Sequence, residues 1–507
     1  MPSFECDVLV VGAGPSGLIL ALCLAMSEPF YRVGRRGAGI TPRTLEVFKI
    51  LGILPEVLKL AHNPVQFQSY ELPGGVKPLK TWSMSPKLEP TPACPFVRYS
   101  RFSTLNCLAN VSDSSTRYFS LNTAPIGFVQ HADRVSARLS NATGGEDEIN
   151  VKYLVGADGA KGIVRKQLGL PFLGETRTDE QLVVSDVIME GLDLEHIHMW
   201  TKPAILAWPG QAKEANLFSV QIVGKEIDRQ KIISDPEEFR RFFRTHTGRE
   251  DVLLKEVVWV SEYTPNIRMV DRLEKERVFV VGGHEFSVQD SFNLGWKLAY
   301  VVLSLSTSDL LSTYTEERLP VVAEMLDKTT ELHKSTFKAD ALDDRSHWQL
   351  NYRWSSIVFH DPQQHKRQYA RGVRQRLHRT ISLSRRDRAP DAPGLKEVGG
   401  DGDGDGASSR SLFDIFKYTT HTVLIFCPQL DQSTINTISV VIYPSSGSDF
   451  VGTQTDLTLR DDDGHSFRGY CASMDRLSCV VVRPDGMVGA MVSDLLGLKK
   501  YFDTILC

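Results

Sequence analysis

A glycine-rich turn near the N-terminus holds the residues whose types and spacing best fit a chemical role. Residues 12–17 read Gly-Ala-Gly-Pro-Ser-Gly and lie between a run of apolar, β-branched residues and a helix-forming segment. Glycines allow a tight turn and a close backbone approach, and free N–H groups at a helix N-terminus attract phosphate. The turn therefore predicts a dinucleotide-binding site, with a purely structural glycine turn as the alternative.

The second half of such a site is missing from the sequence. An acidic residue about 20 residues beyond the glycines normally holds the ribose hydroxyls at the end of the next strand. Here the helix-forming segment runs into Met26-Ser27-Glu28-Pro29 with no strand-like run between them. Glu28 follows Gly17 by only eleven residues, which is too early for this role. We therefore predict that the end of the first helix and the whole second strand are absent.

Two further glycine corners follow strand-like runs. One is Asp158-Gly159, and the other is Gly282-Gly283, just before a long helical segment. The helix that follows Gly282-Gly283 could again offer its N-terminus to a phosphate. An Asp-Gly turn is also common on its own, so a structural role is the alternative for the first corner. If the site exists, Asp158-Gly159 and residues 12–17 should face the same crevice.

The elements that must position these corners alternate between strand and helix, which indicates an α/β core. Strand-like runs cover 6–11, 152–155, 183–187, 217–223 and 278–281, and helical runs cover 18–25, 289–305 and 315–333, the last with a break at Pro320. Asp290, Asn293 and Lys297 share one helix face, which we interpret as structural. A chain of 507 residues exceeds the size of one hydrophobic core, so two or three domains are expected.

The composition changes between residues 365 and 410. A basic stretch is followed by Gly-Gly-Asp-Gly-Asp-Gly-Asp-Gly, which is typical of a solvated linker. Asp401, Asp403 and Asp405 resemble the start of a calcium loop, but Leu412 stands where the required glutamate belongs, so no metal site is predicted. Strand-like runs at 422–426, 439–442 and 479–482 follow. The predicted organisation is therefore 1–364, a linker at 365–410 and a small α/β unit at 411–507.

Composition also sets several classes of function aside. A formal net charge of −4 gives no electrostatic reason to expect nucleic acid or an anionic membrane as partner. The eight cysteines form no C-x-x-C pair, which argues against a zinc cage or a dithiol redox centre. The apolar run from 8 to 26 is broken by glycines and a proline, so we read it as strand, turn and helix and not as a signal peptide or membrane span. A cytoplasmic protein is expected.

Taken in order, these motifs resemble those of the FAD-dependent phenol hydroxylase-like aromatic-ring monooxygenases. The matching segments are 12–17, 36–46 (RGAGITPRTLE), 156–159 (GADG), 265–272 (PNIRMVDR), 289–297 (QDSFNLGWK), 388–392 (RAPDA) and 482–486 (VRPDG). They span nearly the whole chain. The resemblance implies an α/β fold with a Rossmann-type FAD-binding domain, an interleaved mixed-sheet substrate domain and a C-terminal thioredoxin-like domain.

The resemblance also implies cofactors and site residues. The cofactors are FAD and either NADPH or NADH, and a phenolic or polyketide-like aromatic substrate is hydroxylated through a flavin C4a-hydroperoxide. A homodimer is compatible with this organisation. No catalytic side chain is assigned, because the cofactor supplies the chemistry. The implied cofactor-binding residues are Gly12, Gly14, Pro15, Ser16, Gly17, Arg36, Arg101, Asp158, Gly159, Gly282 and Gly283.

The chain departs from the family pattern at three places. The strand before the long helix normally ends in Gly-Asp, but Gly283 replaces the acid, and part of the loop expected beside the isoalloxazine ring is missing. Ala38 stands where the family carries an active-site acid, which leaves the substrate open. Cys427 has no second cysteine at Leu430, so the C-terminal unit is expected to be structural and not redox-active.

These departures leave more than one functional hypothesis. Both missing segments, the one after the first helix and the one after Gly282-Gly283, would contact the same ligand, FAD. Each hydrogen bond that is not made would cost about 1–3 kcal/mol of flavin affinity. The alternative to an active monooxygenase is therefore a non-catalytic or flavin-impaired relative, or a truncated gene model. A plain nucleotide-dependent dehydrogenase is disfavoured, because the Asp158-Gly159 corner and the C-terminal unit would have no place in it.

Overall fold

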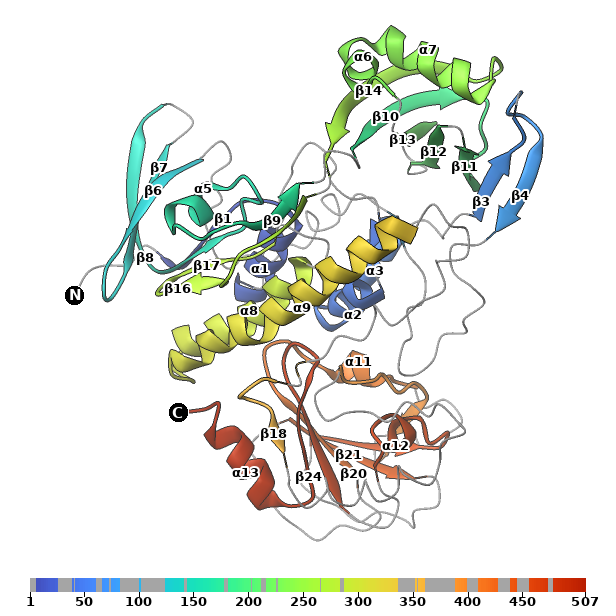
Figure 1. Ribbon diagram of the computed structural model, residues 1–507. Helices are drawn as coiled ribbons and strands as arrows, with labels where there is room; N and C mark the ends of the chain where they lie inside the picture. Colours follow the sequence, from blue (N-terminus) through green and yellow to red (C-terminus); the bar gives the residue numbers. More distant parts are fainter. Residues whose placement is uncertain are drawn as a thin grey trace.

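The fold is known from a computed structural model, which describes most of the chain in separate segments. The described residues are 6–25, 39–40, 42–60, 66–72, 74–82, 100–101, 124–140, 144–176, 181–201, 203–210, 216–224, 227–264, 266–282, 287–335, 352, 354–360, 388–398, 409–426, 438–444, 456–472 and 477–507. Their helices and strands form a mixed α/β structure with three larger sheets (Figure 1). This confirms the predicted fold class.

The first sheet places three parallel strand ends at one level. Val11 at the end of one strand and Val280 at the end of another both align with Gly156 on the strand between them. The glycine corners that follow these strands therefore start at the same edge of the sheet. Its six strands are β1 (Cys6–Val11), β6 (Ala124–Gln130), β7 (Val135–Ser140), β8 (Glu146–Gly156), β16 (Glu274–Lys275) and β17 (Val278–Val280).

Three long helices pack beside this sheet: α1 (Pro15–Ala25), α8 (Ser287–Val302) and α9 (Asp309–Ser335). The predicted break at Pro320 is wrong, because α9 continues through this residue. Proline keeps a helical φ and removes one backbone hydrogen bond. The preceding turn is held by buried ion pairs of Glu317 and Arg318, which offset that loss.

The second sheet has seven strands within the described residues and is mixed, as predicted, because β11 and β3 run parallel while its other pairs are antiparallel. Helices α6 (Arg229–Ser234) and α7 (Pro236–Thr247) cover one face (Figure 1). Alternate residues of the strands, such as Phe218 and Ile205, are fully buried beneath Phe239 and Phe243 of α7. In sheet order the strands are β14 (Leu253–Tyr263), β10 (Leu182–Glu190), β13 (Leu217–Val223), β12 (Ala204–Pro209), β11 (His196–Thr201), β3 (Gln66–Tyr70) and β4 (Pro78–Trp82).

Shorter elements complete this part of the chain. The helices are α2 (Pro42–Ile50), α3 (Leu54–Leu60) and α5 (Ile163–Gln167), and two small sheets pair β2 (Gly39–Ile40) with β5 (Ser100–Arg101) and β9 (Leu173–Thr176) with β15 (Asn266–Met269).

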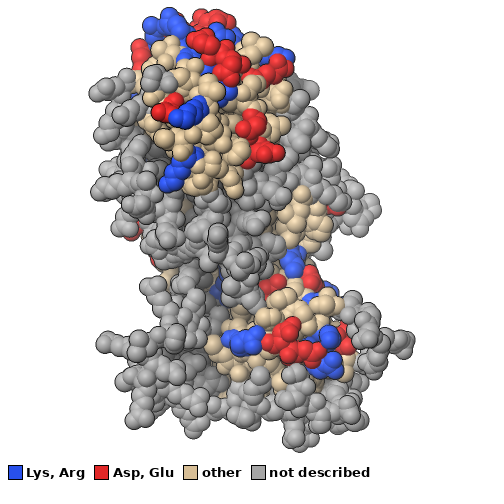
Figure 2. Space-filling view, turned by 90° about the vertical axis from the view of Figure 1, so that its right-hand side faces the viewer, with Lys and Arg blue, Asp and Glu red and all other residues tan. Residues whose placement is uncertain are grey.

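No helix in the described segments combines the length and apolar character that crossing a membrane requires. On the face shown in Figure 2, basic and acidic residues of the described segments are interspersed.

The third sheet belongs to the C-terminal unit and begins earlier in the chain than predicted. Phe359–His360 forms β18 and Leu395–Glu397 forms β19, so strands from before residue 411 join the sheet, one of them from the predicted linker. Both add at the sheet edges, where they pair with β24 and β22. The order is β18, β24 (Val488–Val492), β23 (Ser478–Val482), β20 (Thr422–Phe426), β21 (Ile438–Pro444), β22 (Leu457–Asp461) and β19. Its thioredoxin-like identity stays a prediction.

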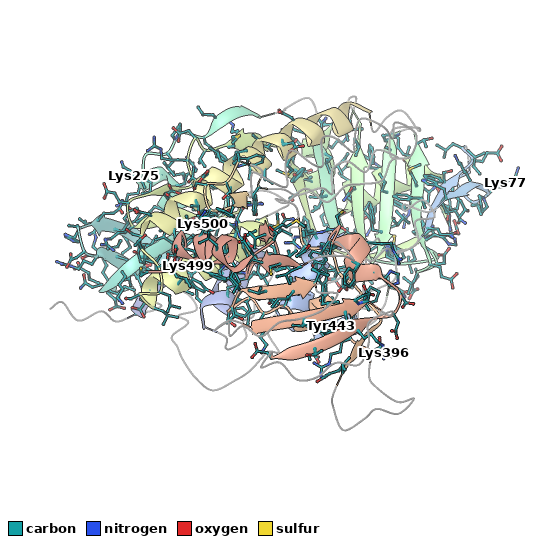
Figure 3. All side chains as sticks on the ribbon, turned by 90° about the horizontal axis from the view of Figure 1, so that it is seen from below. Lys77, Lys275, Lys396, Tyr443, Lys499 and Lys500 are labelled. Atoms are coloured by element: carbon teal, nitrogen blue, oxygen red, sulfur yellow. The ribbon has the colours of Figure 1, made fainter. Side chains whose placement is uncertain are left out.

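Helices α11 (Leu412–Ile415), α12 (His465–Gly469) and α13 (Leu495–Asp503) complete the C-terminal unit. This unit lies against α8, α9 and α2 (Figure 1). Seen from below, Lys275 and Lys77 mark opposite ends of the molecule, and the sheet that carries Tyr443 lies between them (Figure 3).

A buried charge cluster joins the C-terminal unit to the helices. Glu317 of α9 accepts hydrogen bonds from Arg483 Nη2 (2.8 Å), which follows β23, and from Lys297 Nζ (2.8 Å) of α8. Asn293 Nδ2 bridges Glu317 Oε2 (2.7 Å) and Asp485 Oδ2 (3.0 Å). Burial raises the pKa of Glu317, but attraction to Arg483 and Lys297 outweighs it and lowers that pKa far below its ordinary value. The cluster is therefore charged at neutral pH, and Asn293 and Lys297 are structural as predicted.

Replacing Glu317 with Gln should destabilise the protein strongly. The change leaves the buried Lys297 with a neutral partner and the buried Arg483 with Asp485 alone, and breaking a buried pair in this way costs about 3–5 kcal/mol. Chemical denaturation measures this loss. The matched control is Asp503→Asn, which removes an exposed pair with Lys499 and should cost well under about 1 kcal/mol. Equal losses in both variants would contradict the role given to Glu317.

His421 gives the C-terminal unit an acid-sensitive contact. Its ring lies between Trp296 of α8 and Tyr501 of α13, and its Nδ1 is 3.2 Å from the hydroxyl of Tyr300. Burial, assisted by the nearby Arg483, lowers the pKa of His421 to about 3. The folded state therefore favours the neutral ring, while the unfolded chain takes up a proton near the ordinary pKa of about 6.5. Stability from this residue is complete above pH 6.5 and decreases as the pH falls.

In the wild type, protonation of His421 in the unfolded chain should lower the free energy of unfolding by up to about 1.4 kcal/mol for each pH unit between pH 6.5 and 5. His421→Gln should lose this part of the pH dependence. Glutamine retains a hydrogen-bonding group but does not titrate, so the variant and the wild type should diverge as the pH falls. Denaturant titrations at several pH values measure the slopes. An unchanged slope in His421→Gln would refute this account of acid sensitivity.

Candidate cofactor-binding site

Two of the predicted glycine corners are in direct contact. Gly12 has a φ of 113°, and a Cβ at this position would lie 2.5 Å from the carbonyl oxygen of Ala157. A Cβ at Gly17 would lie 1.9 Å from the carbonyl oxygen of Gly12. Ala157 N also donates to Val11 O (2.7 Å), which joins the two strand ends. Only glycine fits at Gly12 and Gly17, and the structure places residues 12–17 beside the backbone of Ala157 and Asp158.

The third corner meets the first at Ser16. Gly282 has a φ of 89°, and a Cβ there would lie 2.8 Å from Ser16 Oγ. Ser291 of α8 donates from Oγ to Ser16 O (2.7 Å), and Val281 N donates to Gly156 O (2.9 Å). All three corners therefore meet where β1, β8 and β17 end.

The start of α1 at this junction is suited to an anion. Gly14 and Pro15 open the helix, and Leu18 N donates to Gly14 O (3.0 Å) as its first hydrogen bond. The first turn carries no acidic side chain. The N-terminal end of a helix has a partial positive charge and N–H groups without partners in the helix. The α1 end and the glycine turn together fit a pyrophosphate.

Asp158 has a local structural role. Its Oδ2 accepts a hydrogen bond from Val164 N (3.2 Å) in the first turn of α5. A Cβ at Gly162 would lie 2.1 Å from Asp158 Oδ1, so this glycine makes room for the carboxylate. Gly159 adopts a φ of 81° at the same corner. In this structure the carboxylate caps α5, which leaves the backbone of the corner as the group available to a ligand.

Asp290, which the sequence led us to interpret as structural, contacts the third corner. Gly282 N donates to Asp290 Oδ2 (3.2 Å), and Arg318 Nε donates to Asp290 Oδ1 (2.7 Å). Arg318 Nη1 in turn donates to the Tyr352 hydroxyl (3.2 Å). Both Asp290 and Arg318 are fully buried. An acid eight residues beyond Gly282 thus anchors this corner, and its position in the first turn of the long helix was the available signal.

A buried acceptor also lies in the first turn of α8. Gln289 is 4% exposed, and its Oε1 has no hydrogen-bond partner within the described residues. A buried polar atom of this kind costs free energy unless a ligand or solvent satisfies it. The close-fitting glycines and the unpaired Gln289 oxygen together fit a polar cofactor at this junction.

The structure describes the remaining predicted site residues only in part. Arg101 lies in β5 opposite Gly39, and the course of its side chain is not described. Arg36, Gly283 and the active-site position Ala38 lie outside the described residues. So does the segment in which the second strand is predicted to be missing. Within the described segments, β1 pairs on one side only, with β8.

Comparison with known proteins identifies the family. The model of the FAD-binding domain family matches residues 5–329, and this chain belongs to that family. A flavin-dependent monooxygenase of Mycobacteroides abscessus is 30% identical over 98% of this chain and 100% of the relative. The 3-(3-hydroxy-phenyl)propionate/3-hydroxycinnamic acid hydroxylase of Paraburkholderia xenovorans is 27% identical over 68% of this chain and 57% of that protein. By this resemblance the chain is an enzyme of the flavin-dependent monooxygenase type.

Solved structures share the fold over the full length of the chain. Aklavinone-11 hydroxylase, solved with FAD and aklavinone, has a TM-score of 0.75 at 21% identity and covers 100% of both chains. The flavin-dependent monooxygenase PieE, solved with FAD and substrate, has a TM-score of 0.74 at 18% identity and covers 99% of both. These matches show that the chain shares the fold of both proteins.

Replacing Gly12 with Ala should weaken FAD binding by at least about tenfold. The added Cβ meets Ala157 O at 2.5 Å and would push the glycine turn away from the second corner. Fluorescence titration of the purified protein with FAD measures the affinity, and circular dichroism checks folding. Gly144→Ala is a matched control, because its φ is also positive (84°) but nothing lies within 4 Å of the added atom. Equal FAD affinity in both variants would argue against a cofactor at this turn.

Proposed function

We propose that this chain is an FAD- and NAD(P)H-dependent monooxygenase that hydroxylates a phenolic or polyketide-like aromatic substrate. The observation that carries the proposal is the meeting of three glycine corners at the ends of β1, β8 and β17, beside the N-terminus of α1. The family match and the hydroxylase relatives support the same chemistry. A cytoplasmic location, a homodimer and a thioredoxin-like C-terminal unit are parts of this proposal that rest on the resemblance.

The residues of the chain have binding and positioning roles in this proposal. Bound FAD would supply the oxygen-transfer chemistry, with NAD(P)H as its reductant. The turn at residues 12–17 and the end of α1 would hold the pyrophosphate, since their N–H groups and positive dipole end suit an anion. Gly159 and Gly282 would let the backbone approach the cofactor closely. Asp158, Asp290 and Arg318 would hold the corners in place without touching the reacting atoms.

A flavin-impaired relative is the second candidate, and one observation favours it. The alignment with the Mycobacteroides abscessus protein runs over 540 positions, more than the 507 residues of this chain. The relative therefore has residues for which this chain has no counterpart. The gaps predicted after α1 and after Gly282 would remove contacts to a cofactor, at about 1–3 kcal/mol for each unmade hydrogen bond.

Purified protein separates the two candidates. The monooxygenase should be yellow with bound FAD, and at least one aromatic probe, either monocyclic such as 2,4-dichlorophenol or fused-ring such as 9-phenanthrol, should stimulate its oxidation of NADH or NADPH. Mass spectrometry should then detect a product heavier by one oxygen atom. A colourless, folded protein that takes up no FAD would overturn the proposal and favour the impaired relative. Sequencing of the transcript would show whether the uninterrupted joins after α1 and Gly282 exist in the messenger RNA.

A further inference from the structure

The seven-stranded sheet has two unlike faces. Residues that point toward α6 and α7, such as Val183, Val187 and Ile222, are fully buried. On the other face Trp208 and Trp259 are only half-buried. Figure 1 shows that this second face is turned toward the rest of the molecule and away from α6 and α7. The structure therefore leaves aromatic surface partly uncovered on the inner side of the sheet.

The residues of this inner face form a row across the strands. Asp186 on β10 is directly opposite Trp259 on β14 and Ser219 on β13. Ser219 is in turn opposite Trp208 on β12, whose ring meets Phe67 of β3 edge-on at 5.7 Å. Beyond Phe67, Trp82 of β4 stacks on it at 5.4 Å with an interplanar angle of 9°. The row is thus aromatic except for Asp186 and Ser219. We call these six residues the aromatic row.

Asp186 is unusual in this row because it is a buried carboxylate with few partners. It is 4% exposed, and its Oδ2 accepts one hydrogen bond, from Trp259 Nε1 at 2.8 Å. Within the described segments its Oδ1 accepts none, and Asp186 is in no ion pair. A buried carboxylate is costly unless several donors or a cation satisfy it, and one neutral indole N–H does not. The geometry leaves Oδ1 without a donor among the described residues, and so able to accept a hydrogen bond from a ligand.

The spacing of the two half-buried tryptophans of the row indicates the size of its occupant. Trp259 on β14 and Trp208 on β12 are three strand intervals apart, which is about 14 Å at about 4.8 Å per interval. A single benzene ring would cover only a fraction of this distance. Flat, fused-ring molecules bury the most surface against aromatic side chains. The dimensions therefore favour a molecule of several fused rings over a monocyclic phenol.

We propose that Asp186 positions a fused-ring phenolic substrate by accepting a hydrogen bond from its hydroxyl group, while Trp259 holds the carboxylate and the aromatic row contacts the rings. This inference rests on the proposed function and names the substrate class of the same enzyme. Hydrogen bonds to a charged acceptor are about twice as strong as neutral ones, so the carboxylate distinguishes a hydroxyl from a methyl ether. Asp186 is a positioning residue and takes no part in oxygen transfer.

The test compares two probes that each have three fused rings, 9-phenanthrol and 9-methoxyphenanthrene. In the second probe a methyl group replaces the hydroxyl hydrogen of the first, so it cannot donate a hydrogen bond. Their dissociation constants are measured on the full chain by tryptophan fluorescence quenching, with and without added FAD. The wild type should bind the phenol at least about tenfold more tightly than the ether. It should also prefer 9-phenanthrol to phenol itself. Equal affinities for the hydroxyl and the ether, or no preference for three rings over one, would overturn the proposal.

Asp186→Asn then tests the carboxylate itself. The asparagine oxygen can still accept the hydrogen bond from Trp259, so the fold should survive, and thermal unfolding checks this. The preference for the phenol should fall to less than about threefold, because the amide NH2, which is a donor, then takes the place of the Oδ1 acceptor. Glu190→Gln makes the same chemical change on the same strand, at a residue paired with Lys255, and should keep the wild-type preference. An undiminished preference in Asp186→Asn would exclude Asp186 as the acceptor.

The design keeps this inference separate from the proposed function. Probe binding needs neither reductant nor oxygen, so it can be measured even if the chain holds no flavin. If the protein takes up no FAD but strongly prefers the phenol, the result contradicts the monooxygenase proposal and supports the role of Asp186. Normal FAD uptake and turnover without that preference would retain the monooxygenase and overturn the role of Asp186.

Discussion

The buried carboxylate of Glu317 holds the molecule in one arrangement. This carboxylate is completely buried, and its charge is balanced by cations from two other parts of the chain, Lys297 of α8 and Arg483 after β23. An ion cluster of this kind adds little net stability compared with apolar packing, but it strongly disfavours any arrangement that separates its members. The next residue on α9, Arg318, binds Asp290 and through it the backbone of Gly282. One turn of α9 thus fixes both the position of the C-terminal unit and the geometry of the third glycine corner.

The glycine corners explain how a site can form from segments that are far apart in the sequence. Parallel strands bring Val11, Gly156 and Val280 to one level, and the chain must then turn away from the sheet within a few residues. At Gly12 and Gly17 the neighbouring backbone occupies the space in which any side chain would lie. The same closeness that excludes side chains presents bare backbone N–H groups at the start of α1. Tight packing and anion binding therefore have the same structural cause.

The sequence predicts the general fold and the corners, because these depend on local patterns. The Gly-Ala-Gly-Pro-Ser-Gly turn and the β-branched runs determine strand, turn and helix without reference to distant residues. Interactions between distant segments were missed. The pairing of Asp290 with Arg318 depends on how α8 and α9 pack, and α9 passes through Pro320 because buried partners hold the preceding turn. Asp186 gave only a weak signal, an acid within the apolar run Val183–Met189, and its pairing with Trp259 appears only once the strand register is known.

The edge strands of the C-terminal sheet have a consequence for how this chain can be divided. Because β18 and β19 precede residue 411, a fragment that starts there would lack both outer strands of its own sheet. The unpaired N–H and C=O groups of β24 and β22 would then face water and other chains, which is a common route to aggregation. The loss of Glu317 would also remove one of the two carboxylates that pair with Arg483, the other being Asp485. The C-terminal unit is thus completed by the segments that precede it, and it is not a module that can be moved unchanged into another protein.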